Sequence, residues 1–397
     1  MALMDVNVNA TRILHTIWMN PGISRIGLSR ELNLNKSTIT KIVSTLLDER
    51  LVILADSPDA TTSKGRKPTG LFLNPDNGVV IGIEIETDGW IGVAVSLNGE
   101  LLDTFTSNTI SSDSSLEPTI RDAIDTARAR MTDKGYRILG VGLGVSGQVD
   151  PYSGILLSSN PLNVHQSYDV RAFASEHYPF PVVIENDANC CCWNVIMDKK
   201  ANRERNFICL LAELRRTGWG VEQDISEIKG VGVGLGLVIK DSVLHGEKFS
   251  AGEFQSVFKR ENNPTQFALS MEELNALYTD NRVWEQVVRE MGRNIALLVN
   301  TLNMSMVKIF GTFVLDGSRM REIFWEEIQD NWLYNDTVEC DIEIAESGKE
   351  AVAVGAAGYF LNRVFTVPDI WEGNETVYPE GIELLRMGIS AAKGQME

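Results

Sequence analysis

Residues 138–150 read ILGVGLGVSGQVD, an apolar and glycine-rich run that ends in a polar turn. Eight consecutive apolar or glycine residues predict a buried strand over 138–145. A second apolar run, PVVI at 181–184, leads directly into the sequence Glu-Asn-Asp at 185–187. Polar residues at the ends of buried strands lie where α/β proteins place their ligand clefts. These two stretches therefore predict an α/β fold with a polar cleft at its strand ends.

Segments of the same kinds recur on both sides of this stretch. Apolar runs predict strands at 79–85, 90–95, 207–211, 230–239 and 307–310. Longer segments with a helical pattern predict helices near 116–132, 282–304 and 350–363. A repeated order of hairpin, strand and helix is typical of two α/β lobes. We expect the first lobe over residues 76–190 and the second over 191–397, with a last helix that can return to the first lobe.

The first 75 residues form a separate unit, with three short amphipathic helical segments followed by two strand-like runs. Ser24 and Asn35 are suited to cap the second and third helices. The residues expected to be buried are Ile13, Leu14, Ile17 and Trp18 in the first segment, Ile26, Leu28 and Leu32 in the second, and Ile39, Ile42, Val43, Leu46 and Leu47 in the third.

The outward face of the third segment is polar and basic, with Lys36, Ser37, Thr38, Thr40 and Lys41 at its N-terminal end. Hydroxyl groups there can reach base edges in a major groove, and the ammonium groups can meet phosphates. The pattern predicts a helix-turn-helix that binds DNA. The alternative is a three-helix protein-interaction module whose polar face is only solvated.

A basic stretch lies between the two strand-like runs at 51–54 and 70–73, which together predict a wing. Arg66 and Lys67 at its tip are placed to enter a minor groove. Helix spacing, capping residues and basic wing together favour a DNA-binding winged helix-turn-helix over the interaction module.

Charge is unevenly distributed along the chain. The formal net charge is −18, yet residues 1–75 contain nine Lys or Arg and six Asp or Glu. A slightly basic head on an acidic body is typical of a DNA-reading module attached to a sensor or enzyme. An acidic surface that only aids solubility would give the same overall charge.

Composition excludes several other classes. No run approaches the roughly 18 uncharged apolar residues that span a bilayer, and polar residues interrupt the first ten positions. We therefore expect a cytoplasmic protein without membrane contact. Five cysteines, three of them consecutive at 190–192, suit reduced thiols better than a disulfide framework, and none has a paired zinc-ligand spacing.

The order of the motifs resembles that of the ROK family, which groups repressors, open reading frames and sugar kinases. The motifs that carry the resemblance are GLGVSGQVD at 142–150, SNP at 159–161, ENDAN at 185–189, GVGVGLG at 230–236 and AGE at 251–253. The resemblance implies a two-lobed, actin-like ATPase body. GRKP at 65–68 is similar to the wing of its repressor branch, which includes repressors that respond to xylose, N-acetylglucosamine or glucose.

The resemblance also implies a sugar site. Sugar recognition needs polar groups that pair with hydroxyls, because a buried unpaired partner costs about 1–3 kcal/mol. The matched positions expected to bind the sugar are Gly147, Asn160, Asn186, Asp187 and Glu253. In the kinases of the family, the residue matched by Asp187 is the base that deprotonates the attacking hydroxyl. The alternative for Asn186 and Asp187 is a capping pair at a strand end.

The nucleotide elements of the kinases are altered in this chain. The first phosphate turn of those kinases has an Asp, two glycines and a threonine, whereas EIETD stands at 84–88 here. Val231 replaces the threonine of the second turn, and Gly311 is followed by Thr312 rather than by a second glycine. Phosphoryl transfer needs amides and small residues around the triphosphate. We therefore expect no ATP binding, no kinase activity and no cofactor.

The zinc element of the family is also altered. A metal-binding histidine and three cysteines usually follow the Gly-Glu pair, but residues 257–275 contain neither Cys nor His. A structural zinc needs four such ligands. We therefore expect no metal, and a loop that is held by the packing of Phe258, Phe267 and Leu269.

These expectations combine into one functional hypothesis. The chain is interpreted as a homodimeric, sugar-responsive transcriptional regulator, most simply a repressor, whose kinase-like body senses a monosaccharide and whose operator is an inverted repeat. One alternative is an active ATP-dependent sugar kinase with a DNA-binding head. Another is a non-catalytic regulator that is controlled by a partner protein.

Overall fold

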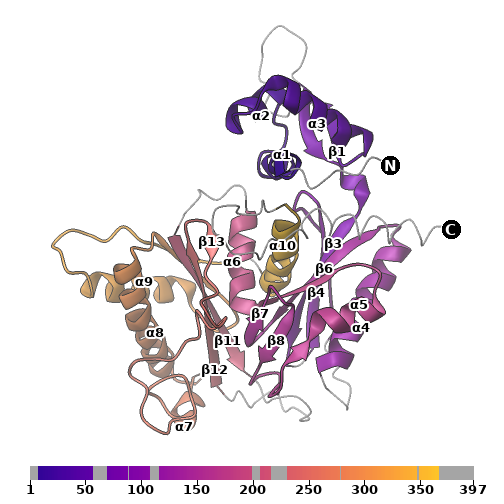
Figure 1. Ribbon diagram of the computed structural model, residues 1–397. Coiled ribbons are helices and arrows are strands. Elements are labelled where there is room, and N and C mark those ends of the chain that lie inside the picture. Colours follow the sequence, from indigo (N-terminus) through magenta and orange to yellow (C-terminus); the bar gives the residue numbers. More distant parts are fainter. Residues whose placement is uncertain are drawn as a thin grey trace.

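Figure 1 shows a two-lobed body with a small N-terminal head above it. This computed structural model describes residues 8–56, 69–87, 89–107, 116–198, 206–215, 230–277, 279–346 and 348–365. Among these residues, no helix is long and apolar enough to cross a membrane.

The first lobe is a five-stranded sheet covered on its outer face by two helices. Its elements are β3 (Val79–Glu86), β4 (Gly89–Ser96), β5 (Leu101–Ser107), α4 (Leu116–Asp133), β6 (Ile138–Val145), α5 (Val170–His177) and β10 (Val182–Asn186). The strand order is β10-β6-β3-β4-β5. Parallel pairing of β10, β6 and β3 brings the C-terminal ends of these strands to one edge of the sheet. A small sheet of β7 (Gln148–Asp150), β8 (Ile155–Ser158) and β9 (Tyr168–Asp169) lies beside them.

The second lobe has a sheet of the order β13-β12-β11-β14-β15. The elements of this lobe are β11 (Asn206–Arg215), β12 (Gly230–Ile239), β13 (Ser242–Val243), α7 (Met271–Leu274), α8 (Asn281–Leu302), β14 (Met306–Phe310), α9 (Gly317–Asp330) and β15 (Asp341–Ile344). Helices α8 and α9 pack on each other and share a hydrophobic core with the sheet.

Two helices lie between the sheets, α6 (Asp187–Met197) and α10 (Ala351–Phe365). Helix α10 packs on β3 and β6, α6 packs on β11 and β12, and the two helices pack on each other (Figure 1). The consecutive cysteines 190–192 lie in this layer as buried free thiols. The expected division between lobes at residue 190 falls inside α6, so the chain passes between lobes in a helix.

Glycines allow this layer to pack backbone against backbone. A Cβ at Gly82 would lie 1.9 Å from the carbonyl oxygen of Ala353, and one at Gly355 would lie 1.7 Å from that of Cys190. Real Cβ atoms do not approach carbonyl oxygens so closely. The glycine-rich character of these segments therefore has a packing cause, whatever ligand the cleft holds.

The head consists of α1 (Val8–Met19), α2 (Arg25–Glu31) and α3 (Lys36–Asp48), followed by the antiparallel pair β1 (Val52–Asp56) and β2 (Thr69–Leu73) and a 3₁₀ turn at Pro75–Asn77. Ser24 caps α2, since its hydroxyl accepts a hydrogen bond from the amide of Gly27 at 3.1 Å. Asn35 stands at the N-cap of α3 without a side-chain capping bond.

One predicted core residue of the head is wrong. Ile26 is 55% exposed, because it stands on the outer face of the short helix α2, of which only Leu28 is fully buried. The buried positions of α1 and α3 include those expected, with Ile42 and Leu47 half-buried at the edge of the core.

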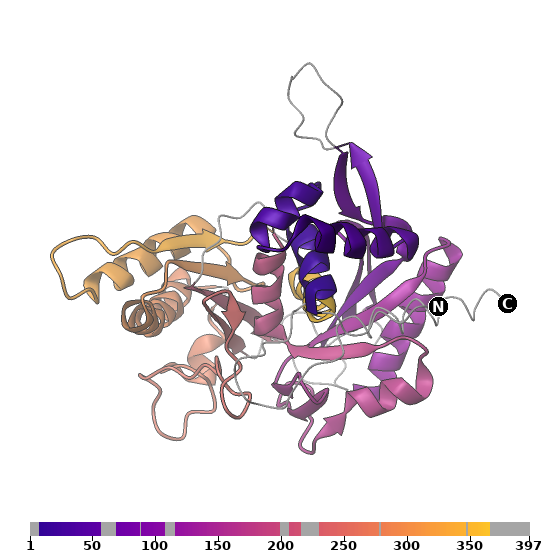
Figure 2. The same cartoon turned by 45° about the horizontal axis from the view of Figure 1, so that its top comes forward.

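The head rests on the C-terminal end of α10 (Figure 1 and Figure 2). The ring of Trp18 in α1 packs against that of Phe365, with centroids 5.2 Å apart. Both rings belong to one hydrophobic cluster that continues from the head into the layer of α6 and α10. A displacement of this layer would therefore also displace the base of the head, which packs on it.

The glycine contact between α10 and α6 generates a stability prediction. Gly355→Ala should lower the free energy of unfolding by about 3 kcal/mol, because the added methyl group meets the backbone of Cys190. Gly292→Ala in α8 is the matched control. Its methyl group would lie 3.3 Å from the side chain of Glu327 and 3.6 Å from the Cα of Phe324, which is an ordinary van der Waals contact. Urea denaturation of both variants measures the difference, and equal stabilities would contradict the packing argument.

Candidate functional site

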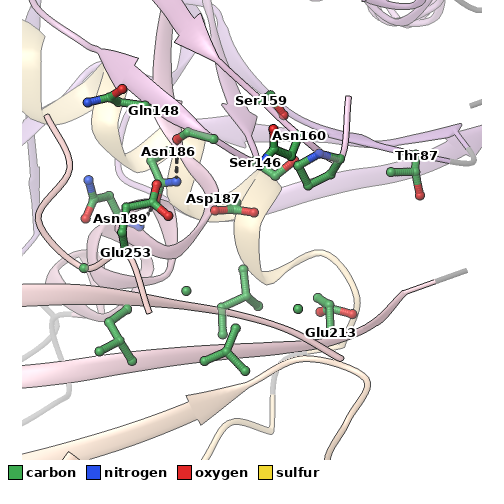
Figure 3. Close-up of a pocket in the computed structure, with 18 of the residues that line it drawn as sticks. Thr87, Ser146, Gln148, Ser159, Asn160, Asn186, Asp187, Asn189, Glu213 and Glu253 are labelled. Atoms are coloured by element: carbon green, nitrogen blue, oxygen red, sulfur yellow. Dashed lines mark hydrogen bonds between the residues drawn. The ribbon is translucent and has the colours of Figure 1, made fainter. Parts of the chain in front are cut away.

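A cleft of about 680 Å³ lies between the two lobes at the C-terminal edge of the parallel strands. Figure 3 shows polar side chains that line it from the first lobe, and those of Glu213 and Glu253 from the second lobe. The five residues predicted to bind sugar all line this cleft, namely Gly147, Asn160, Asn186, Asp187 and Glu253. The structure adds Gln148, Ser159, Asn189 and Gln266 to its polar lining.

Asn186 connects the end of β10 to the turn after β6. Its side-chain oxygen accepts from the amide of Asn189 at 3.1 Å and so caps α6, while its side-chain nitrogen donates to the carbonyl of Gly147 at 3.0 Å. Gly147 has φ of +119°, and a Cβ there would lie 2.3 Å from the carbonyl oxygen of Ser158. Asn186 thus caps α6, and its side chain is held in the lining of the cleft by the bond to Gly147.

Asp187 is the first residue of α6, and one of its carboxylate oxygens accepts from the amide of Ala188 at 2.8 Å. A helix N-terminus stabilises a negative charge at this position. Figure 3 shows the carboxylate directed into the cleft, facing the segment that carries Asn160. This position suits an acceptor for a ligand hydroxyl.

Glu253 enters the cleft from the second lobe. The residue forms an isolated bridge with Gly234 of β12, and the preceding Gly252 has φ of +91°. A Cβ at Gly252 would lie 1.8 Å from the carbonyl oxygen of Leu235, so only glycine fits against the strand there. The glycine of the short motif AGE is therefore required by the way this loop crosses β12.

The other end of the cleft is crowded with carboxylates. Burial raises the pKa of Glu84 well above its ordinary value, and the charges of Glu86, Glu213 and Asp187 raise it further. Glu213 accepts a hydrogen bond from the hydroxyl of Thr312, in the turn that follows β14. This end of the cleft is electrostatically unfavourable for a triphosphate.

The loop after Glu253 is held by hydrogen bonds rather than only by apolar packing. Phe267 and Leu269 are buried as predicted, but Phe258 is 46% exposed, so its predicted role was wrong. The side chain of Gln266 bonds both backbone groups of Val233 and the carbonyl of Phe254 at 2.7–2.8 Å. No group of three or more potential metal ligands occurs among the described residues.

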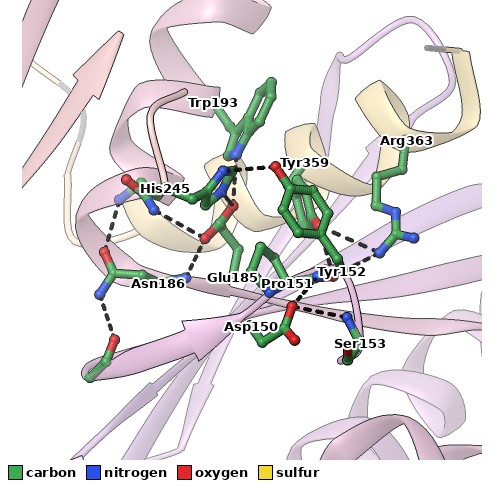
Figure 4. A network of polar contacts seen from close by, with 12 residues as sticks. Asp150, Pro151, Tyr152, Ser153, Glu185, Asn186, Trp193, His245, Tyr359 and Arg363 are labelled. Atoms are coloured by element: carbon green, nitrogen blue, oxygen red, sulfur yellow. Dashed lines mark hydrogen bonds and ion pairs between the residues drawn. The ribbon is translucent and has the colours of Figure 1, made fainter. Parts of the chain in front are cut away.

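A buried network behind the cleft was not predicted from the sequence (Figure 4). Glu185 is fully buried and accepts four hydrogen bonds, from the amide of Asn186 and from the side chains of Asn189, Trp193 and His245. The His245 bond is 2.8 Å long and joins the strand β10 to the loop that leads to Glu253. Burial disfavours a charged imidazole, but the charge and hydrogen bond of Glu185 outweigh it and raise the pKa of His245.

The network continues from His245 toward α10. The hydroxyl of Tyr152 lies 3.2 Å from Nδ1 of His245. The carbonyl of the neighbouring Pro151 accepts from the hydroxyl of Tyr359 at 3.1 Å and from the guanidinium of Arg363 at 2.9 Å (Figure 4). The cleft and the end of α10 beneath the head are thus connected by a continuous set of polar contacts.

A signal for this network exists in the sequence. Glu185 is a carboxylate at the end of an otherwise apolar strand, and a carboxylate in such a position needs a partner. His245 is one of only four histidines in the chain. Their pairing could not be predicted because 59 residues separate them in the sequence.

On the head, α3 presents the predicted DNA-contact residues. Lys36, Ser37, Thr40 and Lys41 are exposed and Thr38 is half-buried. The hydroxyl of Thr40 donates to the carbonyl of Lys36 at 2.8 Å, so in this state it is engaged with its own helix. Arg66 and Lys67 lie outside the described residues.

Comparison with known proteins agrees with the fold and the motif order. Residues 80–263 match the model of the ROK family, so the chain carries a ROK family domain. The resemblance inferred from the motifs is confirmed, as is the fold class. A solved ROK family transcriptional regulator, described as a homologue of the E. coli MLC protein, superposes with a TM-score of 0.69 over 96% of this chain and 98% of its own, at 17% identity.

Two curated relatives are xylose repressors. The one from Bacillus spizizenii is 29% identical over 247 residues, which cover 62% of this chain and 59% of the relative. The one from Caldicellulosiruptor bescii is 25% identical over 91% of this chain and 97% of the relative. The first alignment thus spans about three fifths of that repressor's length, whereas the second spans nearly all of it.

The raised pKa of His245 predicts a pH-dependent contribution to stability. A raised pKa in the folded state gives stability that is fully present below the ordinary value of 6.5 and is lost as pH rises through the folded value. His245→Gln should therefore lower the melting temperature most near pH 6 and progressively less toward pH 9. His165→Gln, at an exposed site, is the matched control. A constant difference between wild type and His245→Gln across this range would contradict the ion pair with Glu185.

Proposed function

We propose that this protein is a sugar-responsive transcriptional repressor whose kinase-like body senses a neutral monosaccharide and has lost ATP binding. The observation that carries the proposal is the division of the cleft into two ends. Amides, hydroxyls and the carboxylates of Asp187 and Glu253 line one end, while Glu84, Glu86 and Glu213 crowd the other. The first end suits sugar hydroxyls, and the second repels phosphates.

The names of the relatives support a regulatory role over a catalytic one. Two relatives are called xylose repressors, and the superposed structure is called a transcriptional regulator. D-xylose is therefore the first monosaccharide to test, with D-glucose and N-acetylglucosamine next. In this proposal Asn160, Asn186, Asp187 and Glu253 bind the sugar hydroxyls, and Gly147 shapes the wall behind them.

The proposed loss of kinase activity has a direct test. Asp187 could act as a base, but no described residue of the cleft other than Lys349 offers a cation to a triphosphate. Wild-type protein with Mg²⁺, ATP and D-xylose should therefore release no more ADP than Asp187→Asn in a coupled assay. Turnover above that control would favour the alternative, a kinase with a DNA-binding head.

DNA binding is assigned to the exposed end of α3. Its lysines and hydroxyls face outward, and the acidic body would repel DNA elsewhere. Since repressors of this architecture read two half-sites, we propose a homodimer and an operator with an inverted repeat. In the proposal, α3 lies in the major groove, and Arg66 and Lys67 of the wing enter the minor groove.

Substitutions in α3 separate affinity from sequence preference. Lys41→Ala should weaken binding to every DNA and reduce the salt dependence by about one ion, because one phosphate contact is lost. Thr38→Ala should mainly relax sequence preference. Arg260→Ala removes a charge from the exposed body and is the matched control. A salt slope of Lys41→Ala that equals that of wild type would remove this lysine from the interface.

Ligand response requires that the sugar binds one arrangement of the dimer better than another. Asp187→Ala and Glu253→Ala should leave operator affinity unchanged without ligand and abolish its change with D-xylose. Glu247→Ala, an exposed carboxylate on the same loop as Glu253 but outside the cleft lining, is the matched control. Fluorescence anisotropy on operator DNA measures all three variants. A normal sugar response in either cleft variant would show that its carboxylate is not part of the sensor.

A further inference from the structure

Phe249 has an unusual backbone conformation for an aromatic residue. Its φ is +55°, and it is the only aromatic among the described non-glycine residues with positive φ, half of which are asparagines. Bulky side chains avoid this region because Cβ meets the neighbouring backbone, whereas glycine adopts it freely. Holding a phenylalanine in this conformation lowers the stability of the fold, and strained residues of this kind are found most often at functional sites.

Contacts from both lobes hold Phe249 in place. Its ring packs edge-on against that of Tyr152, with centroids 5.8 Å apart. Tyr152 belongs to the turn between β7 and β8 and reaches His245 through its hydroxyl at 3.2 Å. The side chain of Gln148 in β7 donates to the carbonyl of Lys248, next to Phe249. The ring is thus fixed by the small sheet of the first lobe while its backbone belongs to the second.

Phe249 is also the only aromatic residue among the described residues that line the cleft. Three residues separate it from Glu253 in the sequence, and Gln148 and Glu253 of the sugar end line the same cleft. It is therefore the one described residue of the lining that can offer an aromatic surface to a ligand in this cleft.

We propose that Phe249 determines which monosaccharide the cleft accepts, by packing its ring on the C–H face of the bound pyranose. This inference rests on the proposed function and deepens it. A pyranose with equatorial hydroxyls presents a continuous C–H face, which an aromatic ring covers without burying a polar group. An axial hydroxyl on that face loses its water without gaining a partner, which is unfavourable. D-xylose is therefore preferred to its C4 epimer, L-arabinose.

The test uses full-length protein, D-xylose and L-arabinose as probes, and isothermal titration calorimetry. Phe249→Gly should raise the Kd for D-xylose by about tenfold or more, the scale of one lost apolar contact in a specificity pocket. Its preference for D-xylose over L-arabinose should shrink. Phe249→Tyr keeps the ring and is the matched control, with both affinities close to those of wild type.

Melting temperatures separate ligand recognition from a structural role. Phe249→Gly should melt above Phe249→Ala, because only glycine relieves the positive φ, although both lose the ring. A Phe249→Gly variant that melts cooperatively and binds both sugars as wild type does would overturn the inference and leave the proposed function intact. A wild type that binds no neutral monosaccharide, D-xylose and L-arabinose included, would reject the proposed function and this inference together.

Discussion

The backbone contact between α6 and α10 is the constraint on which the rest of the structure depends. Gly355 lets α10 approach the carbonyl of Cys190 in α6, and Gly82 lets β3 approach α10 from the other side. Sheet, helix, helix and sheet thereby form one close-packed stack. The N-terminal end of α6 places Asn186 and Asp187 in the cleft, and the C-terminal end of α10 lies beneath the head. The cleft and the base of the head therefore share one close-packed layer of two helices.

Sequence patterns predicted the elements well where burial is continuous, and less well where it depends on context. The strands at 138–145 and 182–186 are apolar on both faces, so their type and their polar ends could be predicted. The exposure of Ile26 could not be predicted, because on a two-turn helix the sequence spacing of apolar residues does not distinguish an exposed isoleucine from a buried one. The predicted packing of Phe258 was wrong for a related reason, because hydrogen bonds of Gln266 hold its loop instead. For the pair of Glu185 and His245, the local pattern indicates that the carboxylate needs a partner but does not identify the histidine, which lies far along the chain.

The geometry suggests why one body can serve both catalysis and regulation. A cleft between two lobes responds to its ligand by changing their relative position. In a kinase that movement would align a triphosphate, but carboxylates occupy this end of the cleft here. In this chain the same movement would displace α10, on which Trp18 and the head rest, and the polar contacts of Pro151 with Tyr359 and Arg363 lie on that route. Under the proposed function, sugar binding would then change DNA binding without any chemical step.

Reciprocity between the two ligands tests this account most directly. If D-xylose changes operator affinity by some factor, operator DNA must change the affinity for D-xylose by the same factor. Calorimetric titration of D-xylose into the free protein, and into the protein saturated with an operator selected from random DNA, gives both values. We predict that the affinity for D-xylose differs between the free protein and the DNA complex, by about 5–150-fold for a typical coupling free energy of 1–3 kcal/mol. Equal affinity for D-xylose in the two states would contradict it.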